Sequence, residues 1–149
     1  MSRAVAVASL GGIGRLKPAP GSWGSLAMLP AALLPPPAIL LLALVVALAG
    51  WLAVRALPAA EVEEDPGWIV VDEAAGMLLA LAALPAGAGW LGIGLAFLLF
   101  RAFDILKPWP VCWADGLAGA TGVMLDDILA GALAAALLGL TGALAPGVL

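Results

Sequence analysis

The sequence predicts an all-α membrane protein, a polytopic helical bundle of about four to five membrane segments in a single domain over residues 1–149. Its composition is the first indication, since 64% of the 149 residues are hydrophobic and only 11% are charged. The mean hydropathy is +1.16, whereas a soluble domain carries about 25% charged residues. The second indication is that the charges cluster and leave three charge-free stretches, 26–54, 74–100 and 128–149. A membrane crossing needs about 20 apolar residues.

The first charge-free stretch is interrupted by "LPPP" at 34–37. Consecutive prolines end helices, so this stretch is interpreted as a membrane hairpin that returns to the side it left. Its leading arm, 24–34, has only 11 residues, which makes that arm short or re-entrant. A single kinked helix over 26–54 is the alternative.

The second charge-free stretch is broken at "PAGAG", residues 85–89. It predicts a hairpin with helical arms over 68–84 and 90–106, each with charged residues at its outer end. The third stretch, 128–149, is long enough for one crossing. We expect its helix to start near Val123, after a turn formed by Gly119, Thr121 and Gly122.

The two hairpins place all charged segments on one face of the membrane. All six Lys and Arg residues then lie on that face, and the positive-inside rule makes it cytoplasmic. The sequence therefore predicts that any site built from the polar residues lies at the cytosolic interface.

Two kinds of chemistry are excluded by residue type. The chain has no histidine, which rules out imidazole bases and imidazole metal ligands. Its one cysteine, Cys112, is followed six positions later by Ala118, where a cysteine phosphatase would need an arginine to hold phosphate. Cys112 is therefore interpreted as an ordinary apolar-site residue.

Most of the polar side chains fall in four short segments. They are "RLKPAPGSWGS" (15–25), "DPGWIVVDEAAGM" (65–77), "RAFDILKPWPV" (101–111) and "GATGVMLDDILAG" (119–131). The first combines two cations with a Pro/Gly/Ser loop at a helix start, where free N–H groups and hydroxyls suit a phosphate. An ordinary juxtamembrane loop would have a similar composition, so this segment alone is weak evidence.

The other three segments place five acids at the ends of charge-free helices. These acids are Asp72, Glu73, Asp104, Asp126 and Asp127. Solvation at a membrane interface, or a favourable helix N-terminus, accounts for single acids. It accounts less well for adjacent pairs, because like charges in a dry setting repel unless a cation or a proton intervenes. Carboxylates without histidine or thiolate are hard oxygen ligands, the set that suits Mg²⁺.

Adjacent acids on a helix diverge by about 100°. Of Asp126 and Asp127, we therefore expect one to face a metal centre and the other to meet a second metal, a water molecule or a cation. The cations near the five acids in this arrangement are Arg15, Lys17, Arg101 and Lys107, which can hold phosphate oxygens. Acids, cations and a membrane interface together indicate phosphoryl chemistry on a lipid headgroup, but the spacing does not name the reaction.

Taken together, the four polar segments resemble the motifs of a known family. "KPAPGSWGS", "WIVVDEAAGM", "FRAFDILKPWPV" and "GVMLDDILAG", in this order between about Arg15 and Gly131, are similar to the motifs of bacterial phosphatidylglycerophosphatase A. The resemblance implies a Mg²⁺-dependent phosphatase of the bacterial inner membrane, with several membrane crossings and a cytoplasmic active site. It also implies that the substrate is the phospholipid phosphatidylglycerophosphate, that the products are phosphatidylglycerol and phosphate, and that nucleic acid is not a partner.

The resemblance assigns roles to the residues of the matching motifs. It implies that the catalytic acids are Asp72, Glu73, Asp104, Asp126 and Asp127. It implies that the metal ligands are Asp72, Glu73, Asp126 and Asp127. The implied phosphate-binding residues are Lys17, Arg101 and Lys107, with Arg15, Ser22 and Ser25 beside them. Water attack or a covalent aspartyl-phosphate, one metal or two, and the oligomeric state stay open.

Two other functions compete with an enzyme. A small ion-coupled transporter or channel subunit would use paired acids to bind a cation in transit, and predicts acids near the bilayer midplane without cations around them. The acids here lie at span ends beside Lys and Arg, which favours the enzyme. A non-catalytic membrane scaffold would leave the Asp126–Asp127 pair unexplained.

Overall fold

The computed structural model describes residues 1–63, 66–145 and 147–149, and every regular element within these ranges is helical. The elements are α1 (Arg3–Ala8), η1 (Leu10–Arg15), α2 (Pro20–Ala27), η2 (Leu29–Leu33), α3 (Pro36–Arg55), α4 (Ala59–Glu63), α5 (Val71–Ala82), α6 (Trp90–Leu106), α7 (Val111–Asp115) and α8 (Gly119–Leu144), where η marks a 3₁₀ helix. The predicted all-α class is confirmed. Asp65, the first residue of one predicted polar segment, lies outside the described residues.

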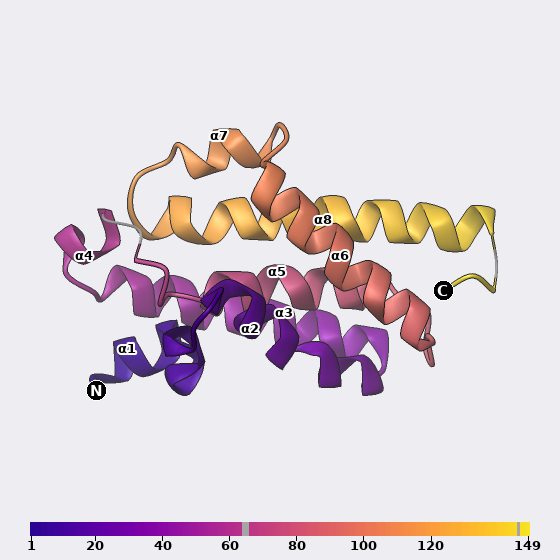
Figure 1. Ribbon diagram of the computed structural model, residues 1–149, viewed down its shortest axis with the longest axis horizontal. Helices are drawn as coiled ribbons and strands as arrows, with labels where there is room; N and C mark the ends of the chain where they lie inside the picture. The colour runs from indigo at the N-terminus through magenta and orange to yellow at the C-terminus, as the bar shows by residue number, and fades with distance from the viewer. Residues whose placement is uncertain (64–65, 146) are drawn as a thin grey trace.

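Helix α5 lies at the centre of the bundle. It packs mainly against α8 and α3, and α6 crosses obliquely over α8 (Figure 1). Most of its residues are buried, among them Met77, Leu78 and Leu81. Because α5 is covered on several sides, its sequence is apolar around most of its circumference and its few polar groups are held inside the molecule.

Glycines let α5 and α8 approach closely. A Cβ atom on Gly131 of α8 would collide with the backbone of Gly76 in α5, because it would lie only 2.8 Å from the Cα atom of Gly76. A Cβ atom on Gly76 would in turn collide with the carbonyl of Asp127 and with the ring of Phe100. Small residues at such a contact permit backbones to touch. The contact sets Asp127 against the first turns of α5.

The first charge-free stretch forms a hairpin with a short leading arm. The chain runs out along α2 and η2 and returns along α3 (Figure 1). Leu34 and Pro35 both have an extended backbone conformation, so the stretch is not one continuous helix. Pro36 then opens α3 at a position where a missing N–H costs nothing.

The second hairpin has unequal arms. Helix α6 spans the predicted residues 90–106, whereas α5 is shorter than the predicted 68–84. The N–H of Val70 donates to the carbonyl of Ala8 (2.9 Å) instead of entering a helical turn. A contact with α1, distant in sequence, therefore delays the start of α5 and ties the N-terminal segment to it.

Helix α8 begins at Gly119, four residues before the predicted start. Asp126 and Asp127 consequently lie in its third turn, and its first turn holds no acid. The interpretation that a helix N-terminus accommodates these acids is therefore wrong, since that effect is confined to the first turn. By length and composition, α3 and α8 are the two described helices that can cross a membrane.

Candidate active site

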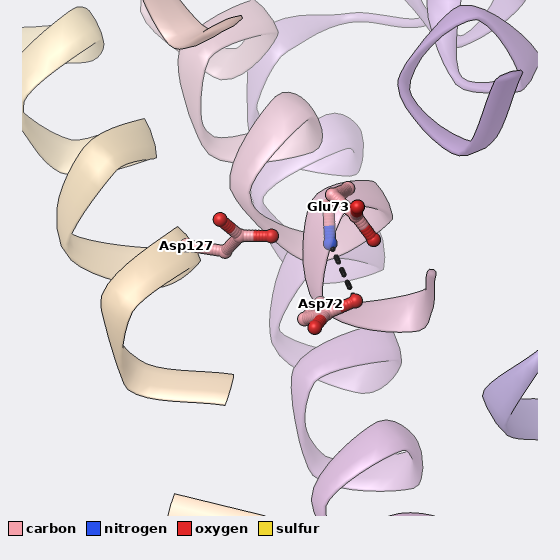
Figure 2. A group of neighbouring side chains, drawn as sticks. All are labelled: Asp72, Glu73 and Asp127. Atoms are coloured by element: carbon pink, nitrogen blue, oxygen red, sulfur yellow. Dashed lines mark hydrogen bonds between the residues drawn. The ribbon is translucent and has the colours of Figure 1, made fainter. Parts of the chain in front are cut away.

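The first turn of α5 presents two of the predicted acids. Asp72 is 9% exposed, and its Oδ1 accepts a hydrogen bond from the backbone N–H of Glu73 (3.0 Å), drawn as a dashed line in Figure 2. The side chain of Glu73 is mostly buried too. Two carboxylates at the start of a helix benefit from its free N–H groups, but at this depth they also need a positive partner.

A third acid comes from α8. Asp127, 3% exposed, points across the helix contact toward Asp72 and Glu73 (Figure 2). One carboxylate oxygen from each residue lies within 4.8 Å of those of the other two. The Oε2 atom of Glu73 is buried and accepts no hydrogen bond from the part of the chain that the structure describes. An orphaned acceptor among converging carboxylates is the donor set that a divalent cation such as Mg²⁺ would satisfy.

The neighbouring acid, Asp126, faces elsewhere. Its Oδ2 lies 3.0 Å from the Nζ atom of Lys107, while its Oδ1 accepts the N–H of Asp127 (3.0 Å). The pair thus diverges as helix geometry predicts, with Asp127 in the carboxylate cluster and Asp126 against a cation.

Lys107 follows directly after α6, in a left-handed backbone conformation (φ 45°, ψ 55°) that ends the helix. Its ammonium bonds Asp126 of α8 and Asp115 of α7. Partial burial acts to lower the pKa of Lys107, but the two carboxylates outweigh burial and raise this pKa above its usual value. Lys107 is therefore a fixed positive charge at physiological pH.

Asp115 is the site residue that sequence reasoning missed. It ends α7, a helix of five residues between two of the predicted motifs, and its side chain is 45% exposed. Its only sequence signal is that it is the one charge between Lys107 and Asp126. Its contact with Lys107 depends on the fold of the connection between α6 and α8.

Arg101 lies against the acids. Its Nη1 atom is 2.6 Å from Asp104 Oδ2 and 4.0 Å from Glu73 Oε1, and all three side chains are about 15% exposed. The pairing with Asp104 is the i, i+3 contact that the sequence predicts. Arg101 is not among the residues that line the pocket described below. Its positive charge therefore compensates the negative charge of the acids from outside the pocket.

The predicted phosphate loop approaches the acids without entering the pocket. A Cβ atom on Gly21 in α2 would collide with the carboxylate of Glu73, so this helix packs directly beside α5. The buried hydroxyl of Ser25 donates to the Gly21 carbonyl (2.9 Å). Arg15 and Lys17 are exposed. The pocket-lining residues among the described ones do not include Arg15, Lys17, Ser22 or Ser25.

A cavity of about 380 Å³ lies between the polar side chains described above. All five predicted acids line it, together with Lys107 and Asp115. Six carboxylates thus face one ammonium, an arrangement that repels an anionic ligand unless cations enter with it. The volume falls in the range of small-molecule sites.

Fold and site together define an all-helical protein of membrane-type composition with a carboxylate-rich pocket between its helices. Residues 6–141 match the family model described as phosphatidylglycerophosphatase A. This match covers most of the chain, and the chain belongs to the phosphatidylglycerophosphatase A family. The resemblance noted in the sequence is thereby confirmed.

Three curated relatives illustrate the similarity. Phosphatidylglycerophosphatase A of Haemophilus influenzae is 40% identical over 80% of this chain and 76% of the relative. Phosphatidylglycerophosphatase A of Escherichia coli is 44% identical over 50% of this chain and 43% of the relative. A putative phosphatidylinositol-3-phosphatase of Bacteroides thetaiotaomicron is 46% identical over 46% of this chain and 43% of the relative. No solved structure matches the chain.

Proposed function

We propose that this protein hydrolyses phosphatidylglycerophosphate to phosphatidylglycerol and phosphate at the cytosolic face of the bacterial inner membrane. The observation that carries the proposal is the pocket that the acids of three family-like motifs line together with Lys107. Two relatives named phosphatidylglycerophosphatase A and the family match support the reaction.

We propose Mg²⁺ as the cofactor. Asp72, Glu73 and Asp127 would hold it, because their oxygens converge and the buried Glu73 Oε2 lacks a partner among the described residues. Bound there, the ion would neutralise acid charge and polarise the phosphate ester. Asp126, also a predicted ligand, is held by Lys107, which favours a supporting role for it.

The chain's own residues would then orient the reactants. Lys107, the one cation among the described residues that line the pocket, would bind phosphate oxygens through its ammonium. A pocket carboxylate would orient the attacking water and accept its proton as the P–O ester bond breaks, and would return that proton to the oxygen of the leaving lipid alcohol. Arg101 would hold Asp104 and Glu73 in place. Arg15, Lys17 and Ser22 do not line the pocket. We propose that they contact the anionic lipid surface near it.

The membrane arrangement is also proposed. Helices α3 and α8 would cross the bilayer, and α5 with α6 would form the second hairpin, after the short α2–η2 arm. Large apolar side chains along α3 are exposed, among them Leu41, Leu44 and Leu48. An exposed apolar row of this kind is costly in water and suits lipid.

Phosphate release from phosphatidylglycerophosphate in detergent micelles tests the function. Purified protein should release phosphate with Mg²⁺ present and should lose that activity in excess chelator, recovering when Mg²⁺ is restored. Undiminished phosphate release in excess chelator would contradict the proposal that the reaction requires Mg²⁺. No release under any divalent cation, together with cation-driven ion flux in proteoliposomes, would instead favour the transporter that the sequence left as an alternative.

A further inference from the structure

Lys107 lies between two carboxylates that come from different helices. Its Nζ atom is 3.0 Å from Asp126 Oδ2 on α8 and is also hydrogen-bonded to Asp115 Oδ1 on α7. The side chain of Asp126 is 12% exposed and that of Asp115 45% exposed, so one partner lies on the pocket wall and the other at its rim. The ammonium therefore bridges a carboxylate of the pocket wall and one at its rim.

The backbone fixes only one end of this lysine. Its N–H donates to Phe103 (2.9 Å) and its left-handed conformation sets the direction of the side chain. Four rotatable bonds follow, and a free lysine would sample many rotamers at an entropic cost when it binds a ligand. With Asp126 as sole partner, the ammonium would be held by one hydrogen bond and the stem would keep more of its rotamer freedom. The second acceptor, Asp115, restricts the position of the ammonium further.

Asp115 brings little benefit to the helix that carries it. It is the last residue of α7, where a negative charge is disfavoured by the helix dipole. Among the described residues, the polar contact of its side chain is with Lys107. Its carboxylate therefore acts on the lysine.

We propose that Asp115 is a positioning residue, which shares the Lys107 ammonium with Asp126 and holds it in the pocket opening to receive the substrate phosphate. The inference rests on the proposed function, in which Lys107 binds phosphate. Asp115 itself does not contact the phosphate, because the two groups carry like charges. Its effect on the reaction passes through Lys107.

Steady-state kinetics with phosphatidylglycerophosphate and Mg²⁺ test the proposal in the variants Asp115→Asn and Asp115→Glu. The control is Cys112→Ala, which changes an exposed residue of the same helix. Asp115→Asn should raise KM about three- to tenfold, the cost of ordering one flexible side chain, and leave kcat within about twofold, because binding is lost equally in ground and transition states. Asp115→Glu should restore most of the affinity, and Cys112→Ala should behave as the native protein.

A double-mutant cycle with Lys107→Met separates positioning from a general structural role. If Asp115 acts through Lys107, Asp115→Asn adds no further loss in the Lys107→Met background. Equal losses in both backgrounds would overturn the proposal. So would a fall in kcat that parallels a lower melting temperature while KM stays unchanged.

Orthovanadate binding by calorimetry makes the proposal independent of turnover. Asp115→Asn should bind vanadate about three- to tenfold more weakly than the native protein in the same Mg²⁺ buffer. If the native protein released no phosphate from the lipid, the proposed function would fail, and weaker vanadate binding would still support positioning. Unchanged or tighter vanadate binding would overturn positioning at any level of activity.

Discussion

At the scale of single residues, the site distinguishes between two adjacent aspartates. Asp127 joins Asp72 and Glu73 in a buried carboxylate cluster, whereas Asp126 is paired with Lys107. Three carboxylates that converge without a cation repel one another strongly in a medium of low dielectric constant. A bound positive charge would therefore stabilise this cluster.

The first prediction concerns Asp127→Asn. The amide keeps the shape of the side chain but removes the charge of a proposed metal ligand, so phosphate release should fall by roughly a hundredfold or more. Phosphate release at saturating lipid and Mg²⁺ measures the loss, with Thr141→Val, at the other end of α8, as the control. Native activity in Asp127→Asn would remove this residue from the catalytic set.

A second prediction concerns Arg101, whose guanidinium lies 2.6 Å from Asp104. Arg101→Gln leaves mostly buried acids without their cation, and breaking a buried ion pair costs about 3 kcal/mol. Thermal unfolding in detergent should therefore occur at a clearly lower temperature. Arg55→Gln is the matched control, because Arg55 stacks on Trp51 (5.1 Å) away from the acids. Equal melting temperatures for the two variants would contradict a compensating role.

At the scale of elements, the contact between α5 and α8 builds the carboxylate cluster. Gly131 lies one turn after Asp127, and Gly76 lies one turn after Asp72. The two glycine backbones touch, which brings both acids to the same level of the bundle. The distance between the helices thus sets the distance between the metal-ligand candidates.

The third prediction tests this spacing with Gly131→Ala. A methyl group there meets the Gly76 backbone, so the helices must separate, at a cost of about 1–3 kcal/mol for overpacking. Activity should fall and the Mg²⁺ concentration needed for half activity should rise. Gly139→Ala on the same helix meets no atom within 4 Å and should be neutral or stabilising by up to about 1 kcal/mol. Equal behaviour of the two variants would contradict the spacing argument.

The sequence predicts the elements where local signals bound them. Helix α6 matches its predicted range because "PAGAG" precedes it and "KPWP" follows it. The start of α5 was not predictable locally, since it depends on the hydrogen bond from Val70 to Ala8. The five acids of the pocket were found because each lies at or near the end of a charge-free stretch. Asp115 was missed because its role arises only when α7 brings it to Lys107.

At the scale of the whole molecule, the polar pocket and the apolar turns lie in different regions. Leu33, Pro35 and Ala86 line one cavity, and Pro85 and Gly147 line another. The turn of each hairpin and the C-terminal segment therefore gather at one end of the bundle, as the double-hairpin interpretation predicts. The acids and Lys107 share none of these cavities.

The last prediction follows from this separation and concerns the side of the membrane on which each region lies. Cys112 is exposed on α7 beside the pocket, so a membrane-impermeant thiol reagent should label it from the cytosolic side. In a Cys112→Ala background, single replacements Leu33→Cys, Ala86→Cys and Val148→Cys, all at exposed positions, should be labelled only from the opposite side. Their common orientation follows from the proposed topology, in which each hairpin would return to the face from which it entered and would keep the six Lys and Arg residues there. Inverted vesicles and intact spheroplasts provide the two accessible faces, and each variant must retain phosphate release. Labelling of Leu33→Cys from the cytosolic side would show that the first hairpin does not cross, and would contradict the double-hairpin arrangement.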